Sequence, residues 1–150
     1  WSDIDLITMR QVMHYLESPA NTLRQIAKRL SPSTIIYICQ IIAPTQGTVT
    51  ALKKVLEQMD TSRPRIFSFE SLYSEIYAAG LSIEKISLTP FSDNFTDWKT
   101  RGLSNRKPET SEGILNGTPP ARELELHKIG DVEYFRNWFC HALVRLDRCN

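Results

Sequence analysis

Hydrophobic positions along the first third of the chain follow two different periods. Residues 4–12 are apolar and β-branched, and residues 34–42 form a nearly continuous apolar run. This pattern predicts two strands, the second of them covered on both faces. Between them, apolar side chains recur at helical spacing from Leu23 to Leu30. A strand, a helix and a second strand form a βαβ unit, so we expect the two strands to pair in parallel.

Proline and small polar residues mark the ends of this first helix. Ser18-Pro19 interrupts the strand pattern, and Asn21 is a residue type that caps helix N-termini, so we expect Asn21 to be the N-cap. Ser31-Pro32-Ser33 ends the helix, because helical backbone is disfavoured for the residue before a proline.

The pattern after Pro44 predicts two further helices. Apolar residues recur at helical spacing from Val49 to Met59, and a second such series follows Ser68, which we expect to cap its helix. Gly80 lies just beyond the last turn of that helix and predicts its end.

The C-terminal half predicts an antiparallel strand pair. Residues 83–88 alternate as a strand does, and residues 133–146 are aromatic and β-prone, so we expect the two to pair. Residues 90–107 are polar and predict a loop, whereas 109–126 predict one or two short helices. The sequence therefore indicates an α/β protein whose residues 1–150 form a single domain.

Composition and charge narrow the classes of function. The net charge of +1 gives no electrostatic reason to expect a nucleic acid or an anionic membrane as partner. No apolar run approaches the ~18 residues of a transmembrane helix. Cys39, Cys140 and Cys149 show no CxxC spacing, which is typical of reduced thiols, and we expect a cytoplasmic protein in which Cys39 is a buried apolar residue. The histidines lack metal-ligand spacing, so no metal site is expected.

Four segments are informative because of their order and spacing. They are DIDLITMRQVMHYLE from Asp3 to Glu17, LSPSTIIYI from Leu30 to Ile38, FSFESLYSEIYAAGL from Phe67 to Leu81, and Asp97-Trp98 followed by the aromatic last strand. Together they resemble the second half of class I SAM-dependent methyltransferases of the ubiquinone/menaquinone-biosynthesis kind (type 11 methyltransferase-like). The resemblance implies a partial Rossmann-like methyltransferase sheet of parallel strands plus an antiparallel C-terminal hairpin, with flanking helices. Its strands would correspond to strands four to seven of the family's seven-stranded sheet.

The chain departs from this family in its glycines. The motif Asp-x-Gly-x-Gly-x-Gly does not occur, although the family holds SAM (S-adenosylmethionine) with it at the first strand. We therefore expect the C-terminal portion of a methyltransferase domain, without its N-terminal SAM-binding half, and doubtful binding of the family's cofactor by this chain alone. Ser33 and Thr34 replace the usual glycines of the turn before the second strand, which predicts a different backbone shape there.

Candidate site residues follow from the position of ligands in open α/β sheets, beyond the carboxyl ends of the parallel strands. That edge holds Arg10, Gln11 and His14 after the first strand and Gln40 after the second. The resemblance implies that Arg10 and Gln11 bind the cofactor and that His14 faces the substrate, where it could act as a catalytic base. The alternatives are a solvated charge for Arg10, a packed ring for His14 and a backbone-bonded strand residue for Gln40.

Aromatic and basic residues outside this edge are further candidates. We expect Trp98 to bind the substrate together with Gln40 of that edge, with a packing role as the alternative for Trp98. Arg63 and Arg65 are either a clamp for an anionic substrate or exposed loop charges.

Three functions are compatible with these patterns. The first is a SAM-dependent methyltransferase acting on a small molecule by in-line methyl transfer. The second is a catalytically inactive methyltransferase-like remnant that serves as a binding or dimerisation module. An incomplete sheet would leave residues 4–12 as a bare edge, so we expect a homodimer or pairing with the missing N-terminal half. The third is an unrelated α/β binding module, which a sheet that does not place 34–42 beside 4–12 would support.

Overall fold

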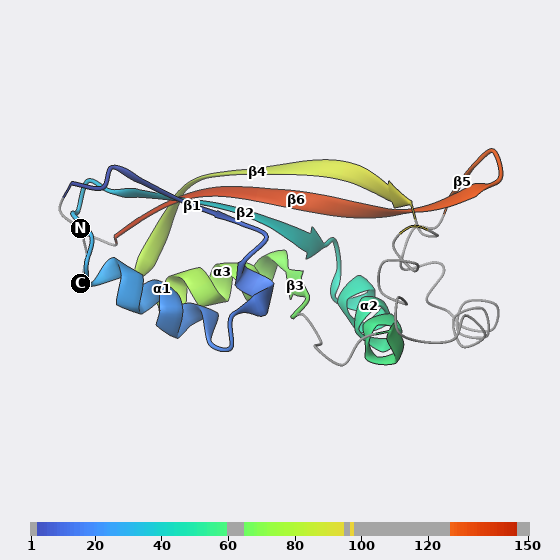
Figure 1. The fold of residues 1–150 in the computed structure, drawn as a ribbon, viewed down its shortest axis with the longest axis horizontal. Helices are drawn as coiled ribbons and strands as arrows, with labels where there is room; N and C mark the ends of the chain where they lie inside the picture. Colours follow the sequence, from blue (N-terminus) through green and yellow to red (C-terminus); the bar gives the residue numbers. More distant parts are fainter. Residues whose placement is uncertain (1–2, 60–64, 95–96, 98–126, 147–150) are drawn as a thin grey trace.

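The computed structural model describes residues 3–59, 65–94, 97 and 127–146 (Figure 1). Along the chain its elements are β1 (Leu6–Arg10), the 3-10 turn Met13–Tyr15, α1 (Pro19–Ala27), β2 (Ile35–Ala43), α2 (Gln46–Met59), β3 (Phe67–Ser68), α3 (Phe69–Ala78), β4 (Leu81–Asn94), β5 (His127–Ile129) and β6 (Val132–Leu146).

The sheet has the order β1-β2-β6-β4. β1 and β2 are parallel neighbours, with Leu6 opposite Ile35 and Arg10 opposite Cys39, which confirms the predicted βαβ pairing. An unrelated α/β module would have been supported by a sheet in which these two strands are not neighbours, and the structure does not have that order. The short strands β3 and β5 pair with the end of β2 and the start of β6.

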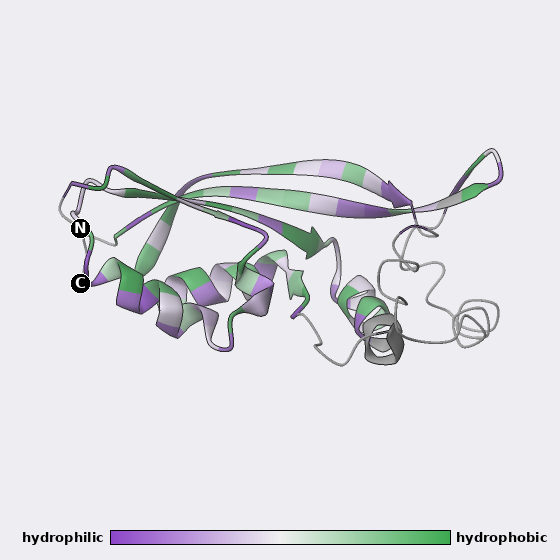
Figure 2. Cartoon of the chain, viewed as in Figure 1, coloured by the Kyte–Doolittle hydropathy of each residue, from purple (hydrophilic) through white to green (hydrophobic). Residues whose placement is uncertain are grey.

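The last strand lies inside the sheet and not at its edge. β6 is antiparallel to β2, with Ile36 opposite Val144, and antiparallel to β4, with Leu81 opposite Leu146. The predicted pairing of the last strand with residues 83–88 is confirmed. Hydropathy is banded along β4 and β6, whereas the end of β2 is uniformly hydrophobic (Figure 2).

The loop predicted to begin at residue 90 was placed too early. β4 continues through Asn94, because β6 offers an uninterrupted partner of 15 residues whose pairing extends over the polar positions. Pro90 is compatible with this strand, since β4 is an edge strand in the described sheet and can lack one backbone donor. The helices predicted over 109–126 lie outside the described residues.

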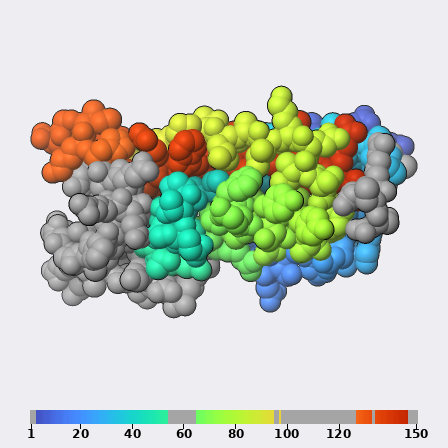
Figure 3. Space-filling view, turned by 180° about the vertical axis from the view of Figure 1, so that it is seen from behind, coloured from blue at the N-terminus to red at the C-terminus, as the bar shows by residue number. Residues whose placement is uncertain are grey.

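The described helices cover one face of the sheet. α1 and α3 share one hydrophobic cluster with residues of β1, β2 and β6, and α3 also contacts β4, while α2 lies at the far end of β2 (Figure 1). Seen from behind, α3 (green) and α2 (teal) lie side by side below β4 and the end of β6 (Figure 3). The helices that the structure describes are too short or too polar to cross a bilayer.

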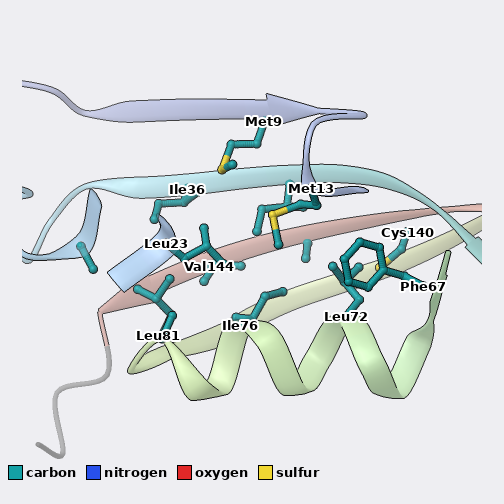
Figure 4. Packing of buried hydrophobic residues seen from close by; sticks show 14 of the residues in the cluster. Met9, Met13, Leu23, Ile36, Phe67, Leu72, Ile76, Leu81, Cys140 and Val144 are labelled. Carbon is teal, nitrogen blue, oxygen red and sulfur yellow. The ribbon is translucent and has the colours of Figure 1, made fainter. Parts of the chain in front are cut away.

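The core fills the space between this helical layer and the sheet. Leu72 and Ile76 of α3 point toward the strands, and Met13 reaches into the same cluster from the turn after β1 (Figure 4). The alternate residues Cys140, Ala142 and Val144 of β6 are fully buried. Met13 therefore fixes the segment that follows β1 to the core, one residue before His14.

The helix ends confirm one predicted cap and correct another. Ser68 caps α3, accepting from the backbone N–H of Ser71, as expected. Asn21 is not a cap, because α1 already begins at Pro19, whose ring is preorganised for the first helical position. The free N–H of Ala20 instead donates to Glu75 Oε2 of α3 at 2.8 Å, so a carboxylate from another helix replaces the local cap.

Backbone with positive φ is confined to a few described positions. Gly80 ends α3 at φ 77°, as its place in the sequence predicts. Ser33 and Thr34 do not adopt positive φ, as expected for a turn without glycine, and Gln11 is the one described non-glycine residue that does.

Gly80→Ala should destabilise the protein by about 1 kcal/mol, because an L side chain is strained at this φ although the space around it is open. Gly80→Asn should cost less, since asparagine tolerates left-handed backbone. Urea unfolding of both variants measures the difference, and an alanine variant as stable as the wild type would contradict it.

Cys140 should resist alkylation in the folded protein. Burial, with a smaller contribution from nearby Cys39, raises the pKa of its thiol to about 11. A rise of this size leaves roughly 100-fold less reactive thiolate, and the fully buried sulfur is also inaccessible. Peptide mass spectrometry after iodoacetamide treatment, with and without denaturant, measures the labelling; comparable labelling in both would contradict the burial.

Candidate functional site

The parallel pairing of β1 and β2 brings two polar segments together at their carboxyl ends. The Gln11 N–H donates to the Cys39 carbonyl at 2.8 Å, one step beyond the regular pairing. Gln11 then turns the chain at φ 53°, which leads into the 3-10 turn Met13–Tyr15 that carries His14. A strained backbone at a non-glycine residue in this position is a common feature of functional sites.

Hydrogen bonds join the side chains of Gln11, Gln40 and His14. The backbone N–H of Ile41 donates to Gln11 Oε1 at 3.2 Å. Gln40 Nε2 lies 3.4 Å from the same oxygen and 2.9 Å from His14 Nδ1. The structure thus brings together three of the residues that the sequence places at this edge, and Gln40, 2% exposed, is at their centre.

Arg65 supports this cluster from the segment before β3. Its N–H donates to the His14 carbonyl at 3.1 Å, and its guanidinium contacts Glu75 at 2.7 Å and the Glu17 carbonyl at 3.2 Å. Arg65 is exposed and lies outside the helices and strands, as the second alternative expected, and its charge is paired with Glu75; Arg63 lies outside the described residues. Arg65 connects the His14 turn to α3.

A cavity of about 160 Å³ opens beside the amide cluster. Its walls combine polar side chains with apolar ones from β2, α2 and β6. They are Gln11, His14, Gln40, Ile41, Ala43, Leu52, Arg65, Ile66, Asp93, Phe135 and Asn137. A mostly apolar pocket with a few polar groups is typical of small-molecule sites.

The last two strands contribute residues that the sequence did not single out. Asn137 is 5% exposed and lies on the same face of β6 as the buried Phe135, two positions before it, while Asp93 lies near the end of β4. An amide that alternates with buried aromatic residues along a strand was the available signal for Asn137. Without the pairing of β6 to β2, nothing in the sequence connected it to Gln40.

Buried polar atoms without a partner gather around this cavity. Within the described residues, Gln11 Nε2, Gln40 Oε1 and Asn137 Oδ1 are buried and make no hydrogen bond. Buried polar groups are nearly always bonded, so unsatisfied ones indicate a place where a ligand or water completes the set.

The structure does not bring two further sequence candidates to the cavity within the described residues. Arg10 is exposed at the end of β1 and does not line it, so its cofactor role stays a prediction. Trp98 lies outside the described residues. Among the residues that the structure describes, His, Cys, Asp and Glu side chains form no group that could hold a metal.

Burial sets the protonation state of His14. Desolvation lowers the pKa of the imidazole below its ordinary 6.5, and the hydrogen bond with Gln40 opposes this shift only in part. His14 is therefore neutral at physiological pH, with one nitrogen carrying a proton and the other a lone pair.

Comparison with known families identifies the architecture. The family model described as a methyltransferase domain matches residues 2–86, which is more than half of the chain. The chain belongs to the methyltransferase domain family. The matched region includes β1, β2 and the Gln11–Gln40–His14 cluster.

Solved structures share the fold of this methyltransferase domain at low identity. A provisionally assigned methyltransferase from Bacillus halodurans is similar over 97% of this chain, with a TM-score of 0.79 and 18% identity. The YcgJ protein from Bacillus subtilis is similar over 95%, with a TM-score of 0.69 and 15% identity. The chain covers 66% and 63% of those two proteins, which is less than two thirds of their length. No curated protein matches significantly by sequence.

His14 should make the stability of the protein depend on pH. Its folded pKa lies below 6.5, so the unfolded chain binds this proton more readily, and stability is lost as pH falls from 6.5 through the folded pKa. Urea unfolding at a series of pH values should show a flatter dependence for His14→Gln across that window. An unchanged slope in the variant would contradict the buried, neutral state.

Proposed function

We propose that this chain is part of a SAM-dependent methyltransferase that transfers a methyl group in line to a small molecule. The observation that carries the proposal is the cavity beside Gln11, His14 and Gln40, at the carboxyl ends of two parallel strands of a methyltransferase-type sheet. Its polar groups suit one small substrate that is bound in a fixed orientation, and positioning is the main requirement of this chemistry.

The volume of the cavity indicates that it holds the methyl acceptor and not the nucleoside part of the methyl donor. An apolar cavity of about 150 Å³ holds one benzene ring, so the present volume of about 160 Å³ suits a single ring and not a nucleoside. When bound, SAM supplies an electrophilic methyl group on a sulfonium. The described residues fit only its methyl-bearing end, near Gln11, and the contacts of its ribose and adenine have no candidates among them.

The roles proposed for the site residues follow this division. Arg10 and Gln11, at the end of β1, contact the cofactor. His14 and Gln40 contact the acceptor, and Trp98 remains a proposed further substrate contact. The buried free thiols of Cys39 and Cys140 support the cytoplasm as the compartment.

A second candidate function is a binding or dimerisation module without catalysis. It is favoured by the outer edge of β1, which pairs with no other strand in the described sheet and exposes 54% of Leu6. Such an edge is a template for another strand, either from a second copy or from an N-terminal half. A stable dimer in light scattering, without any affinity for the cofactor product, would favour this function.

Titration of S-adenosylhomocysteine into the purified protein tests the first proposal. A dissociation constant below roughly 100 μM, equivalent to about −5.5 kcal/mol, would support a cofactor site that this chain forms by itself. Adenosine is the control ligand, because it lacks the sulfur end that the described residues are proposed to meet. Absence of binding by calorimetry would contradict a SAM site in this chain.

Arg10→Gln should weaken that binding at least about tenfold, because one charge-assisted hydrogen bond contributes about 1.5–3 kcal/mol. Lys28→Gln is the matched control, since it removes the same charge from an exposed position at the end of α1. Equal affinities of the two variants would exclude a direct contact of Arg10.

A further inference from the structure

The hydrogen-bond partner of His14 decides what its ring offers to a ligand. A neutral imidazole has one N–H donor and one lone pair, and the bond made by one nitrogen fixes the role of the other. Nδ1 lies 2.9 Å from Gln40 Nε2. If the amide of Gln40 donates in this contact, the proton of His14 is on Nε2.

Backbone groups determine how the two glutamine amides are oriented. The Ile41 N–H can only donate, so the atom of Gln11 at 3.2 Å is its oxygen. Gln40 then presents one end of its amide to two acceptors, Gln11 Oε1 at 3.4 Å and the Ile41 carbonyl at 3.3 Å. That end is the nitrogen, because the reverse orientation would place three oxygens against one another.

We propose that Gln40, oriented by Gln11, is a positioning residue that holds the His14 proton on Nε2, so that His14 donates a hydrogen bond to the substrate and does not act as its base. The inference rests on the proposed function for the identity of the ligand. Within the described residues His14 has no other side-chain hydrogen bond, which leaves Nε2 available. The left-handed backbone at Gln11 aims the amide that begins this series of bonds.

The donor role indicates a class of substrate. An N–H pairs with a lone pair and is most favourable toward an ionised oxygen, since such bonds are roughly twice as strong as neutral ones. An acidic phenol or enol, which is ionised before it binds, needs no base at His14. The other charged residues that line the cavity are Asp93 and Arg65, and the guanidinium of Arg65 is paired with Glu75.

Nitrogen-15 NMR of the histidine rings tests the tautomer directly, without a methyl donor. At mildly alkaline pH the wild type should show His14 protonated on Nε2, with its signals assigned by their loss in His14→Gln. Gln40→Glu should move the proton to Nδ1, because a carboxylate can only accept. Gln40→Met, which neither donates nor accepts strongly, should give a mixture and serves if the glutamate variant does not fold. A wild-type ring protonated on Nδ1 would overturn the proposal.

A matched pair of ring ligands tests the substrate class. At a pH where 4-nitrophenol is ionised, we expect it to bind at least about tenfold more tightly than neutral 4-nitroaniline, and His14→Phe should abolish the difference. Equal binding of the two probes would overturn the assigned class. A further outcome is a His14 protonated on Nε2, with tighter binding of 4-nitrophenol than of 4-nitroaniline, in a protein that does not bind S-adenosylhomocysteine. In that case the methyltransferase proposal fails while the role of Gln40 stands.

Discussion

The parallel pairing of β1 with β2 is the constraint on which the site depends. It places the end of β1 beside Cys39, so that the Gln11 turn and Gln40 meet at one edge of the sheet. Because side chains alternate along a strand, a slip of one residue would turn Gln40 to the other face and separate it from His14. The apolar residues that alternate with Gln40, Ile38 and Ile42, are buried in the core and specify the register. The same burial that stabilises the fold therefore positions the polar cluster.

Helix α3 also helps to hold in place the turn that carries His14. Glu75 accepts the free N–H at the start of α1 and pairs with Arg65, whose backbone bonds the His14 carbonyl. The Arg65–Glu75 pair is partly exposed and contributes little energy by itself. Its effect is geometric, because it connects the His14 turn to two helices that already pack on the core. A site held in this way needs little rearrangement when a small ligand enters.

The sequence was sufficient for the local elements and for half of the site. Apolar runs and helical spacing predicted β1, β2 and α3, since each buries a surface whose period is visible along the chain. Gln11, His14 and Gln40 were found because the end of a parallel strand can be recognised locally. Asn137 and Asp93 were missed because only the pairing of β6 brings them to the cavity. Asn21 was misassigned as a cap because Glu75, more than fifty positions later, supplies the bond that a local cap would have made.

The central place of β6 has a consequence for how the protein is made. Ile36 pairs with Val144, so β2 stays without this neighbour until 108 further residues (144 − 36) have been synthesised. Pairings between such distant residues close large loops and form slowly. During synthesis the edge of β2 is open and apolar, and a nascent chain in that state can associate with other chains. Chaperone contacts during translation should therefore concentrate on residues 34–42 and end once β6 has emerged and paired with β2.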